Sequence, residues 1–296
     1  MKRLKMKQGN WGYFFIAPFF IVFLIFGLYP IVFTFQLSMK SWNGFSDIKK
    51  AGFSNWARIF KDEFFWLTIK NTLKIWVMDF VPQLFFALVL SLIFSLNKIR
   101  GMRFFRAVYY LPNLITAASI GLLFNLLFGG EGSTINNLLV TLGVDGAPFH
   151  FFQSPSFTQG IASYILWWMW FGYTTVLVMA GITAIDPCLY EAAQLDSCNQ
   201  RQIFTKITMP LIRPTIIYIT VTSVIGGMQI FDVPANLTNM SGDPQKAILT
   251  TSMYVYTQGF TNRNFGYASA LSVALFLIIA ALSFLVFKSM QRKGEN

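Results

Sequence analysis

Six long apolar runs divide this chain of 296 residues, and polar segments separate one run from the next. A helix that crosses the bilayer needs roughly 20 mainly apolar residues. Each run reaches that length and is apolar on all sides, whereas the strands of a membrane barrel are short and alternate. The pattern therefore predicts an all-α transmembrane protein with six spans, at about 13–37, 68–96, 107–128, 159–184, 209–232 and 266–287.

The segment 186–214 between the fourth and fifth runs is a polar island with three acids and three bases. Apolar residues recur in it at helical spacing, first in 189–195 and again in 203–207. Asp186 is suited to cap the first of these helices, because a proline follows it at the first turn. We expect two short amphipathic helices joined near 197–199, whose apolar side needs a partner to cover it.

Composition and charge support a membrane protein. Hydrophobic residues make up 55% of the chain and charged residues 12%, against about 25% charged residues in soluble domains. The net charge of +11 could suggest a nucleic-acid partner, but loop topology explains it better. By the positive-inside rule, 14 bases fall on one side and 7 on the other, although five of those 7 lie in the 38–67 loop and weaken the pattern. We therefore expect the tails 1–10 and 289–296 and the island on the cytoplasmic side. The bases on that side are Lys2, Arg3, Lys5, Lys7, Lys98, Arg100, Arg103, Arg106, Arg201, Lys206, Arg213, Lys288, Arg292 and Lys293.

Asp79 is an acid inside the second run, and an acid in a membrane helix is a functional candidate by default. The alternative is structural: a salt bridge to Lys74, five residues earlier, or a position close enough to the interface to reach water. The structural alternative is favoured, because Asp79 lies near the outer end of its helix and a deep charge costs several kcal/mol.

Polar and aromatic residues in the fourth and fifth runs are candidates for a solute path. Trp167 and Trp170 lie three residues apart and several residues from either end of their run. They fit an aromatic belt or helix packing, and they equally fit stacking on sugar rings in a transporter. Gly226 and Gly227 indicate close packing or cavity space, and Gln229 should face protein, water or ligand rather than lipid.

The residues of common enzyme sites are missing from the sequence. It has no nucleotide-binding loop, no Cys/His metal spacing and no Ser/His/Asp set, and its single histidine, His150, falls in a predicted outer loop. We therefore expect no catalytic residue, no bound metal and no cofactor in this chain. Cys188 and Cys198 both fall in the island, where a cytoplasmic position would keep them reduced.

The island resembles the cytoplasmic coupling motif of ABC importer permeases. It contains Glu191 followed by two alanines, then Asp196, Phe204 and an Ile-Thr-Met-Pro ending at Pro210. Further matches favour the carbohydrate-uptake branch, which serves oligosaccharides and glycerol-phosphate compounds; they include Leu-Tyr-Pro at 28–30, Asn-Thr-Leu at 71–73 and Phe-Gly-Tyr-Ala-Ser-Ala at 265–270. The resemblance extends from about residue 11 to 288.

The resemblance implies a permease domain at 11–288 that forms half of a translocation path in the cytoplasmic membrane of a prokaryote. Its partners would be a second, non-identical permease, two ATPase subunits that hold ATP and Mg, and an external solute-binding protein. The loop 186–208 would dock on the ATPase. A neutral sugar is the preferred solute, because spans four to six carry no base beyond Arg213 near the cytoplasmic end. The alternatives are a glycerol-phosphate-type or other polar solute, an ion-coupled secondary transporter and, least favoured, a membrane-embedded enzyme.

The resemblance also assigns residues. The coupling residues would be Glu191, Ala192, Ala193, Asp196, Ser197, Phe204 and Pro210. The matching sugar positions, with Trp167 and Gln229 added from their own chemistry, are Trp167, Trp168, Met169, Trp170, Ser223, Gly226, Gly227, Gln229 and Ile230. One position departs from the motif, since Ser197 replaces a glycine that allows a turn with positive φ. Either Ser197 holds that turn with some strain, or the turn moves to Asn199, which tolerates the left-handed region.

Overall fold

A computed structural model describes residues 10–96 and 101–292 of the chain. The chain divides into two compact units, one made of residues up to 62 together with 255–276, the other of 63–254 together with residues from 277 onward. The structure is helical apart from one two-stranded sheet in the described residues. The all-α fold is therefore confirmed. The N- and C-terminal tails defined from the sequence lie largely outside the described residues.

The first unit contains one long apolar helix and a small polar cap. The helix consists of α1 (Asn10–Val22), a π-helical turn (Phe23–Leu28) and α2 (Tyr29–Ser38). Within its span-length stretch 12–38, the most apolar window buries none of its residues, and only Leu37 and Ser38 at the end of α2 are buried. Apolar side chains exposed on every face are what a helix in contact with lipid or with another subunit requires.

The cap of the first unit is held by side-chain bonds across its turns. Strands β1 (Lys40–Ser41) and β2 (Lys49–Lys50) pair antiparallel and lead to α3 (Ser54–Lys61). Asn55 Nδ2 donates to the carbonyl of Ser38 at 3.0 Å. The first half of α15 (Phe265–Arg292) brings the fully buried Tyr267 against α3, where Arg58 lies 3.9 Å from the centre of its ring.

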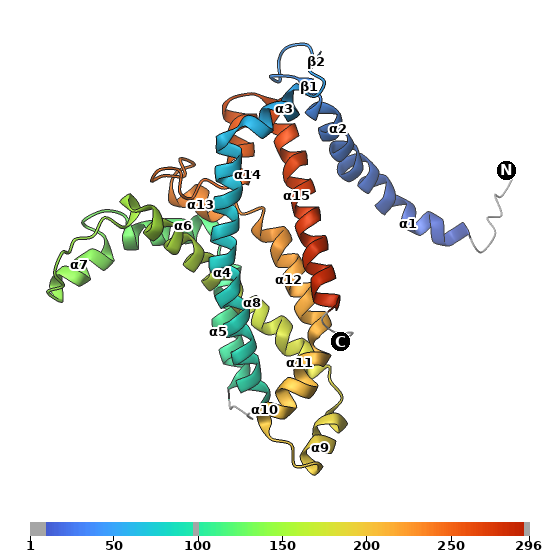
Figure 1. The fold of residues 1–296 in the computed structure, drawn as a ribbon, viewed down its shortest axis with the longest axis vertical. Helices are drawn as coiled ribbons and strands as arrows, with labels where there is room; N and C mark the ends of the chain where they lie inside the picture. The colour runs from blue at the N-terminus through green and yellow to red at the C-terminus, as the bar shows by residue number, and fades with distance from the viewer. Residues whose placement is uncertain (1–9, 97–100, 293–296) are drawn as a thin grey trace, which may run out of the picture. The chain divides into compact units, whose positions relative to one another are not determined.

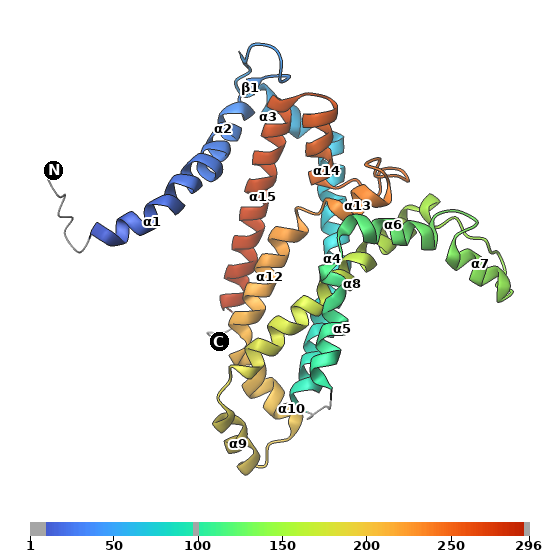
Figure 2. The same cartoon turned by 180° about the vertical axis from the view of Figure 1, so that it is seen from behind.

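The second unit is built on two long helices, α4 (Glu63–Leu96) and α8 (Pro155–Thr183), which lie side by side in both Figure 1 and Figure 2. Helix α5 (Met102–Leu114) packs on α8, and α12 (Arg213–Gly227) contacts both α4 and α8. A side chain at Gly172 of α8 would overlap the backbone of Tyr109 in α5, so glycine permits this close crossing.

Two apolar clusters hold these helices together. One joins α4 and α8 to α6 (Ala117–Phe128) and α13 (Asp232–Leu237), with Ile75, Phe124 and Ile165 among its members. The other joins α4, α8 and α12 through residues such as Phe80, Val178 and Ile216. Shorter α-helices of this unit are α7 (Thr134–Thr141), α9 (Pro187–Leu195), α10 (Gln200–Ile203) and α11 (Met209–Leu211). The helix α14 (Thr251–Tyr256) begins in this unit and ends in the first.

The third apolar run differs from the uninterrupted span predicted at 107–128. Helices α5 and α6 meet at an angle of 92°. Ile115 between them is extended, with ψ of 139°, and the Thr116 side chain accepts a hydrogen bond from the Ser119 amide and so caps a new helix. Five described helices are long and apolar enough to cross a membrane, and this bent pair makes the sixth if it counts as one span.

The fifth span, at 213–237, contains a break that its apolar run did not predict. The helix α11 precedes α12, which begins at Arg213 with Pro214 in its first turn and ends at Gly227. Residues 228–231 leave the helix before α13 begins at Asp232. The local break places Ile230 beside the end of α12, where the candidate site lies.

Candidate solute cavity and coupling loop

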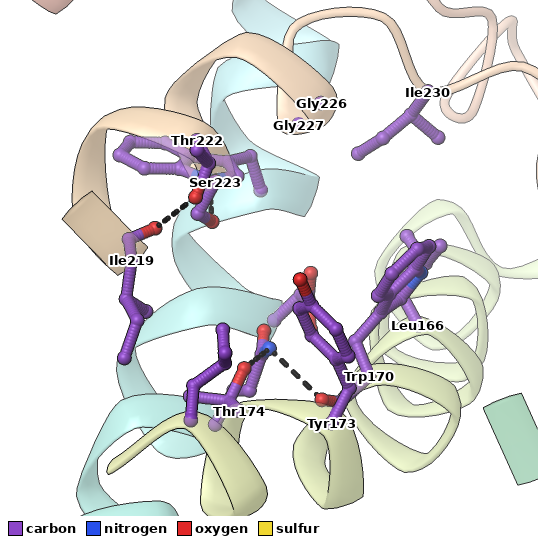
Figure 3. Close-up of a pocket in the computed structure, with 14 residues that line it drawn as sticks. Leu166, Trp170, Tyr173, Thr174, Ile219, Thr222, Ser223, Gly226, Gly227 and Ile230 are labelled. Carbon is purple, nitrogen blue, oxygen red and sulfur yellow. Dashed lines mark hydrogen bonds between the residues drawn. The ribbon is translucent and has the colours of Figure 1, made fainter. Parts of the chain in front are cut away.

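Helices α4, α8 and α12 enclose a cavity of about 250 Å³ (Figure 3). Its size approaches the lower end of the range of about 300–1,000 Å³ that is typical of small-molecule sites. The residues that line it come from all three helices and from the break after α12. They are Trp76, Asp79, Gln83, Leu166, Trp170, Tyr173, Thr174, Leu177, Ile219, Thr222, Ser223, Gly226, Gly227 and Ile230.

One wall of the cavity is fixed by Trp76 of α4. Its indole Nε1 donates to Ser223 Oγ of α12 at 3.0 Å, and its ring stacks on Phe80 with ring centres 5.5 Å apart. A Cβ atom at Gly227 would overlap the indole, so glycine is what lets α12 approach this ring. The hydrogen bond and the close approach together hold α12 against α4.

Gln83 lies on the same face of α4, about two turns beyond Trp76, and joins this helix to α8. Its Nε2 donates to Thr174 Oγ1 at 2.6 Å and to the Trp170 carbonyl at 3.2 Å, and both acceptors belong to α8 (Figure 3). Only 6% of Gln83 is exposed. A buried amide whose donors are satisfied in this way ties α4 to α8 at the level of the cavity.

The cavity combines aromatic surface with hydrogen-bonding groups. Trp170 is 44% exposed, and Tyr173 packs edge-on against it with ring centres 5.8 Å apart. Asp79, Thr222 and Ser223 add oxygen atoms. Among the described residues that line the cavity, none is lysine, arginine or histidine. Such a lining suits a polar, uncharged solute with an apolar face better than an anion.

The predicted solute-path residues separate into two groups in the structure. Trp170, Ser223, Gly226, Gly227 and Ile230 line the cavity together. The others do not line it. Trp167 stacks on Phe171, and Trp168 and Met169 pack in the apolar cluster around α8. Exposed Gln229, just after α12, donates to the Ile225 carbonyl in that helix.

Sequence reasoning assigned no path residue to α4, although that helix forms a whole wall of the cavity. Trp76, Asp79 and Gln83 follow one another at intervals of three and four, which places them on one helix face. That polar stripe within an apolar helix was the available signal. Tyr173, Thr174 and Thr222, which also line the cavity, offered no comparable pattern.

The structure corrects the favoured interpretation of Asp79. The predicted salt bridge to Lys74 is not formed, because Lys74 Nζ donates to Gln159 Oε1 in α8. Asp79 is 6% exposed and lines the cavity, and its Oδ1 has no hydrogen-bond partner within the described part of the chain. Lys74 therefore links α4 to α8, whereas Asp79 lines the cavity.

The 186–208 loop forms the predicted helical pair. Asp186 Oδ1 accepts a hydrogen bond from the Cys188 amide at 2.9 Å and caps α9. Asn199 and Gln202 form a reciprocal capping box at the start of α10. In Figures 1 and 2 the two helices lie beyond the ends of α8 and α12. Cys188 and Cys198 are both free.

The turn after α9 is at Ser197, which has φ of 57°, whereas Asn199 has φ of −76°. The Cys198 amide donates to the Ala193 carbonyl and the Ser197 amide to the Gln194 carbonyl, each at 3.0 Å. This pair of bonds is the Schellman arrangement, which normally places glycine at the left-handed position. Of the two alternatives, the structure therefore has serine holding the turn.

The surface of this loop is formed by several of the predicted coupling residues. Glu191, Ala192, Asp196, Ser197 and Pro210 are exposed, whereas Ala193 is buried and Phe204 is partly buried at the start of a π-helical turn. Leu195 is 87% exposed, an unusual position for a leucine in a folded loop. A hydrogen bond of 3.2 Å between the hydroxyl groups of Tyr190 and Thr208 joins α9 to the π-helical turn that follows α10.

Potential metal ligands are dispersed in the described part of the chain. No group of three or more His, Cys, Asp or Glu side chains in residues 10–96 and 101–292 is placed to hold a metal ion. His150 lies on an exposed loop with its Nε2 3.6 Å from Glu131 Oε1.

The fold and the site define a multi-pass helical membrane protein with a solute-sized cavity among its spans and an exposed helical loop. Residues 5–293 match the family described as "Binding-protein-dependent transport system inner membrane component". The chain belongs to this family. The resemblance to importer permeases seen in the sequence is thus confirmed, and so is a multi-pass position in the inner membrane.

Two curated relatives cover nearly the whole chain. The lactose transport system permease protein LacF of Rhizobium radiobacter is 31% identical over 283 residues, which cover 95% of this chain and 94% of the relative. The arabinooligosaccharides transport system permease protein AraP of Bacillus subtilis is 28% identical, with 98% and 95% covered. A solved bacterial alginate ABC transporter, in complex with its periplasmic protein bound to alginate pentasaccharide, has a similar fold, with a TM-score of 0.80, 22% identity and coverage of 98% and 97%.

Proposed function

We propose that this chain is one of two permease subunits of an ATP-driven ABC importer that takes up a neutral saccharide. The carrying observation is the cavity between α4, α8 and α12, with its exposed Trp170, its oxygen-bearing side chains and no basic residue among the described lining residues. Family membership and the sugar names of the relatives LacF and AraP support the same function. A glycerol-phosphate-type solute is less favoured, because an anion requires bases in its site.

The partners of the proposed importer are a second permease, two ATPase subunits that bind ATP and Mg, and an external solute-binding protein. The family description itself names dependence on a binding protein, and the similar alginate transporter was solved with one. In this function the chain is a transport subunit without catalytic residues. Its termini and the 186–208 loop would lie in the cytoplasm of a prokaryotic cell.

The 186–208 loop would dock in a groove of the ATPase and transmit its movement. Three observations support this role: the loop projects beyond α8 and α12, its outer surface includes exposed Leu195, and Glu191 is exposed beside it. Since α8 ends just before the loop and α12 begins just after it, movement of the loop would move two of the three cavity helices.

The test is co-expression of the chain with its partner subunits, followed by purification and ATP-driven sugar uptake in proteoliposomes. Glu191→Lys reverses a charge on the proposed docking surface, and we expect at least a tenfold loss of uptake and weaker retention of the ATPase. Asp145→Lys makes the same charge change on a different exposed loop and should leave uptake unchanged. Purification without any associated ATPase, or full uptake by Glu191→Lys, would disprove the proposal.

A further inference from the structure

Asp79 has no assigned role, and its environment in the cavity is unusual. The side chain is 6% exposed, and Oδ1 has no hydrogen-bond partner in the described part of the chain. A buried polar atom without a partner lowers stability, and native structures keep such atoms mainly at functional positions or where water or a ligand binds. Because Asp79 lines the cavity, a solute in the cavity can reach it.

The neighbouring donors are directed to other acceptors. Trp76 Nε1, three residues before Asp79, donates to Ser223, and Gln83 Nε2, four residues after it, donates to α8. Lys74 is bonded to Gln159. The described part of the chain therefore directs these donors to other groups. Asp79 lines the cavity as a residue, and its Oδ1 is a buried acceptor without a partner.

We propose that Asp79 is a solute-binding residue whose carboxyl group accepts a hydrogen bond from a hydroxyl group of a saccharide held in the cavity. The proposal rests on the proposed function as a saccharide importer. The saccharide ring packs its apolar face on the exposed ring of Trp170, which lines the same cavity, as aromatic rings accept other apolar surfaces. Helix α4 thus contributes directly to recognition, in addition to α8 and α12.

The experiment uses the full importer in nanodiscs and a reporter cysteine in the cavity. The background carries Cys188→Ser and Cys198→Ser, which remove the two cysteines of the chain. Gly226→Cys supplies the reporter, because a Cβ atom at Gly226 meets no other atom within 4 Å and the residue lines the cavity. The rate of modification by a small water-soluble thiosulfonate is measured against rising concentrations of lactose, maltose or arabinobiose.

The quantity compared is the sugar concentration that halves the rate of modification, measured with whichever of the three sugars protects best. Asp79→Leu removes the acceptor at similar size and should raise this concentration at least tenfold, as expected for a hydrogen bond that a carboxylate accepts. Asp79→Asn retains an Oδ1 acceptor and should raise it less than about threefold. Asp145→Leu makes the same chemical change on an exposed loop and should leave it unchanged.

A second variant distinguishes loss of the sugar contact from a folding defect of Asp79→Leu. In the same background Asp79→Cys should itself react with the thiosulfonate, since the side chain lines the cavity, and sugar should slow that reaction. An unreactive cysteine at 79, or equal protection in wild type and Asp79→Leu, overturns the contact while leaving saccharide uptake intact. A reactive cysteine at 226 that none of the three sugars protects counts against the saccharide cavity itself, and against the proposed function with it.

Discussion

The two adjacent glycines at the end of α12 offer a sharp test of the cavity wall. Gly226 and Gly227 are consecutive in sequence and in the same helix, but a Cβ atom at Gly226 meets nothing within 4 Å, whereas one at Gly227 would overlap the Trp76 indole. Alanine at Gly227 must therefore displace Trp76, which also breaks or lengthens its hydrogen bond of 3.0 Å to Ser223. Alanine at Gly226 displaces nothing.

The expected free energies follow from these contacts. Replacing glycine by alanine in a helix gains up to about 1 kcal/mol, and less near a helix end. Overpacking costs about 1–3 kcal/mol, and loss of the indole hydrogen bond costs about 1 kcal/mol more. Gly227→Ala should therefore destabilise the protein by about 1–4 kcal/mol, and Gly226→Ala should be neutral or stabilising by up to about 1 kcal/mol.

The assay is the thermal unfolding midpoint of the purified importer, measured for both variants in the same nanodiscs. The two variants share the gain from alanine in a helix, so they should differ by about 2–4 kcal/mol. With a shift of about 2 °C per kcal/mol for a chain of this size, Gly227→Ala should unfold about 4–8 °C below Gly226→Ala. Sugar uptake should also fall in Gly227→Ala, because the displaced indole enters the cavity. Equal midpoints for the two variants would mean that α12 does not approach Trp76 as described.

Two further predictions concern the turn after α9 and the tie between α4 and α8. Because Ser197 has φ of 57°, Ser197→Gly should preserve or improve uptake. The β-branched Ser197→Val should lower the stability of the turn by about 1–2 kcal/mol and speed hydrogen exchange in the amides of α9. Equal exchange in the two variants would contradict a left-handed turn at this residue. Gln83→Leu should lower stability by about 1–3 kcal/mol, because Thr174 and the Trp170 carbonyl lose their donor. An unchanged unfolding midpoint would show that these bonds do not hold the helices together. The matched control is Gln229→Leu, at an exposed position whose amide donates only to Ile225, four residues earlier.

The sequence by itself was sufficient wherever the signal was local. The apolar runs predicted the helical membrane fold because a bilayer span depends on the length and polarity of one segment. Asp186 was recognised as a helix cap, and the turn was placed within 197–199, because capping and left-handed turns depend on the residues beside them. The break between α5 and α6 was also local, through the cap at Thr116, but its apolar surroundings concealed it.

Only the tertiary structure decided which side chains meet in the cavity. Of four neighbouring residues of α8 at 167–170, the packing of α5, α6 and α4 leaves Trp170 alone on the cavity, because the rotation of a helix depends on its partners. Lys74 lies five residues before Asp79 in sequence, but its Nζ donates a hydrogen bond to Gln159 of α8 instead. A stretch of apolar sequence determines that a helix crosses the membrane, whereas contacts between helices distant in sequence determine which of its faces meets a solute.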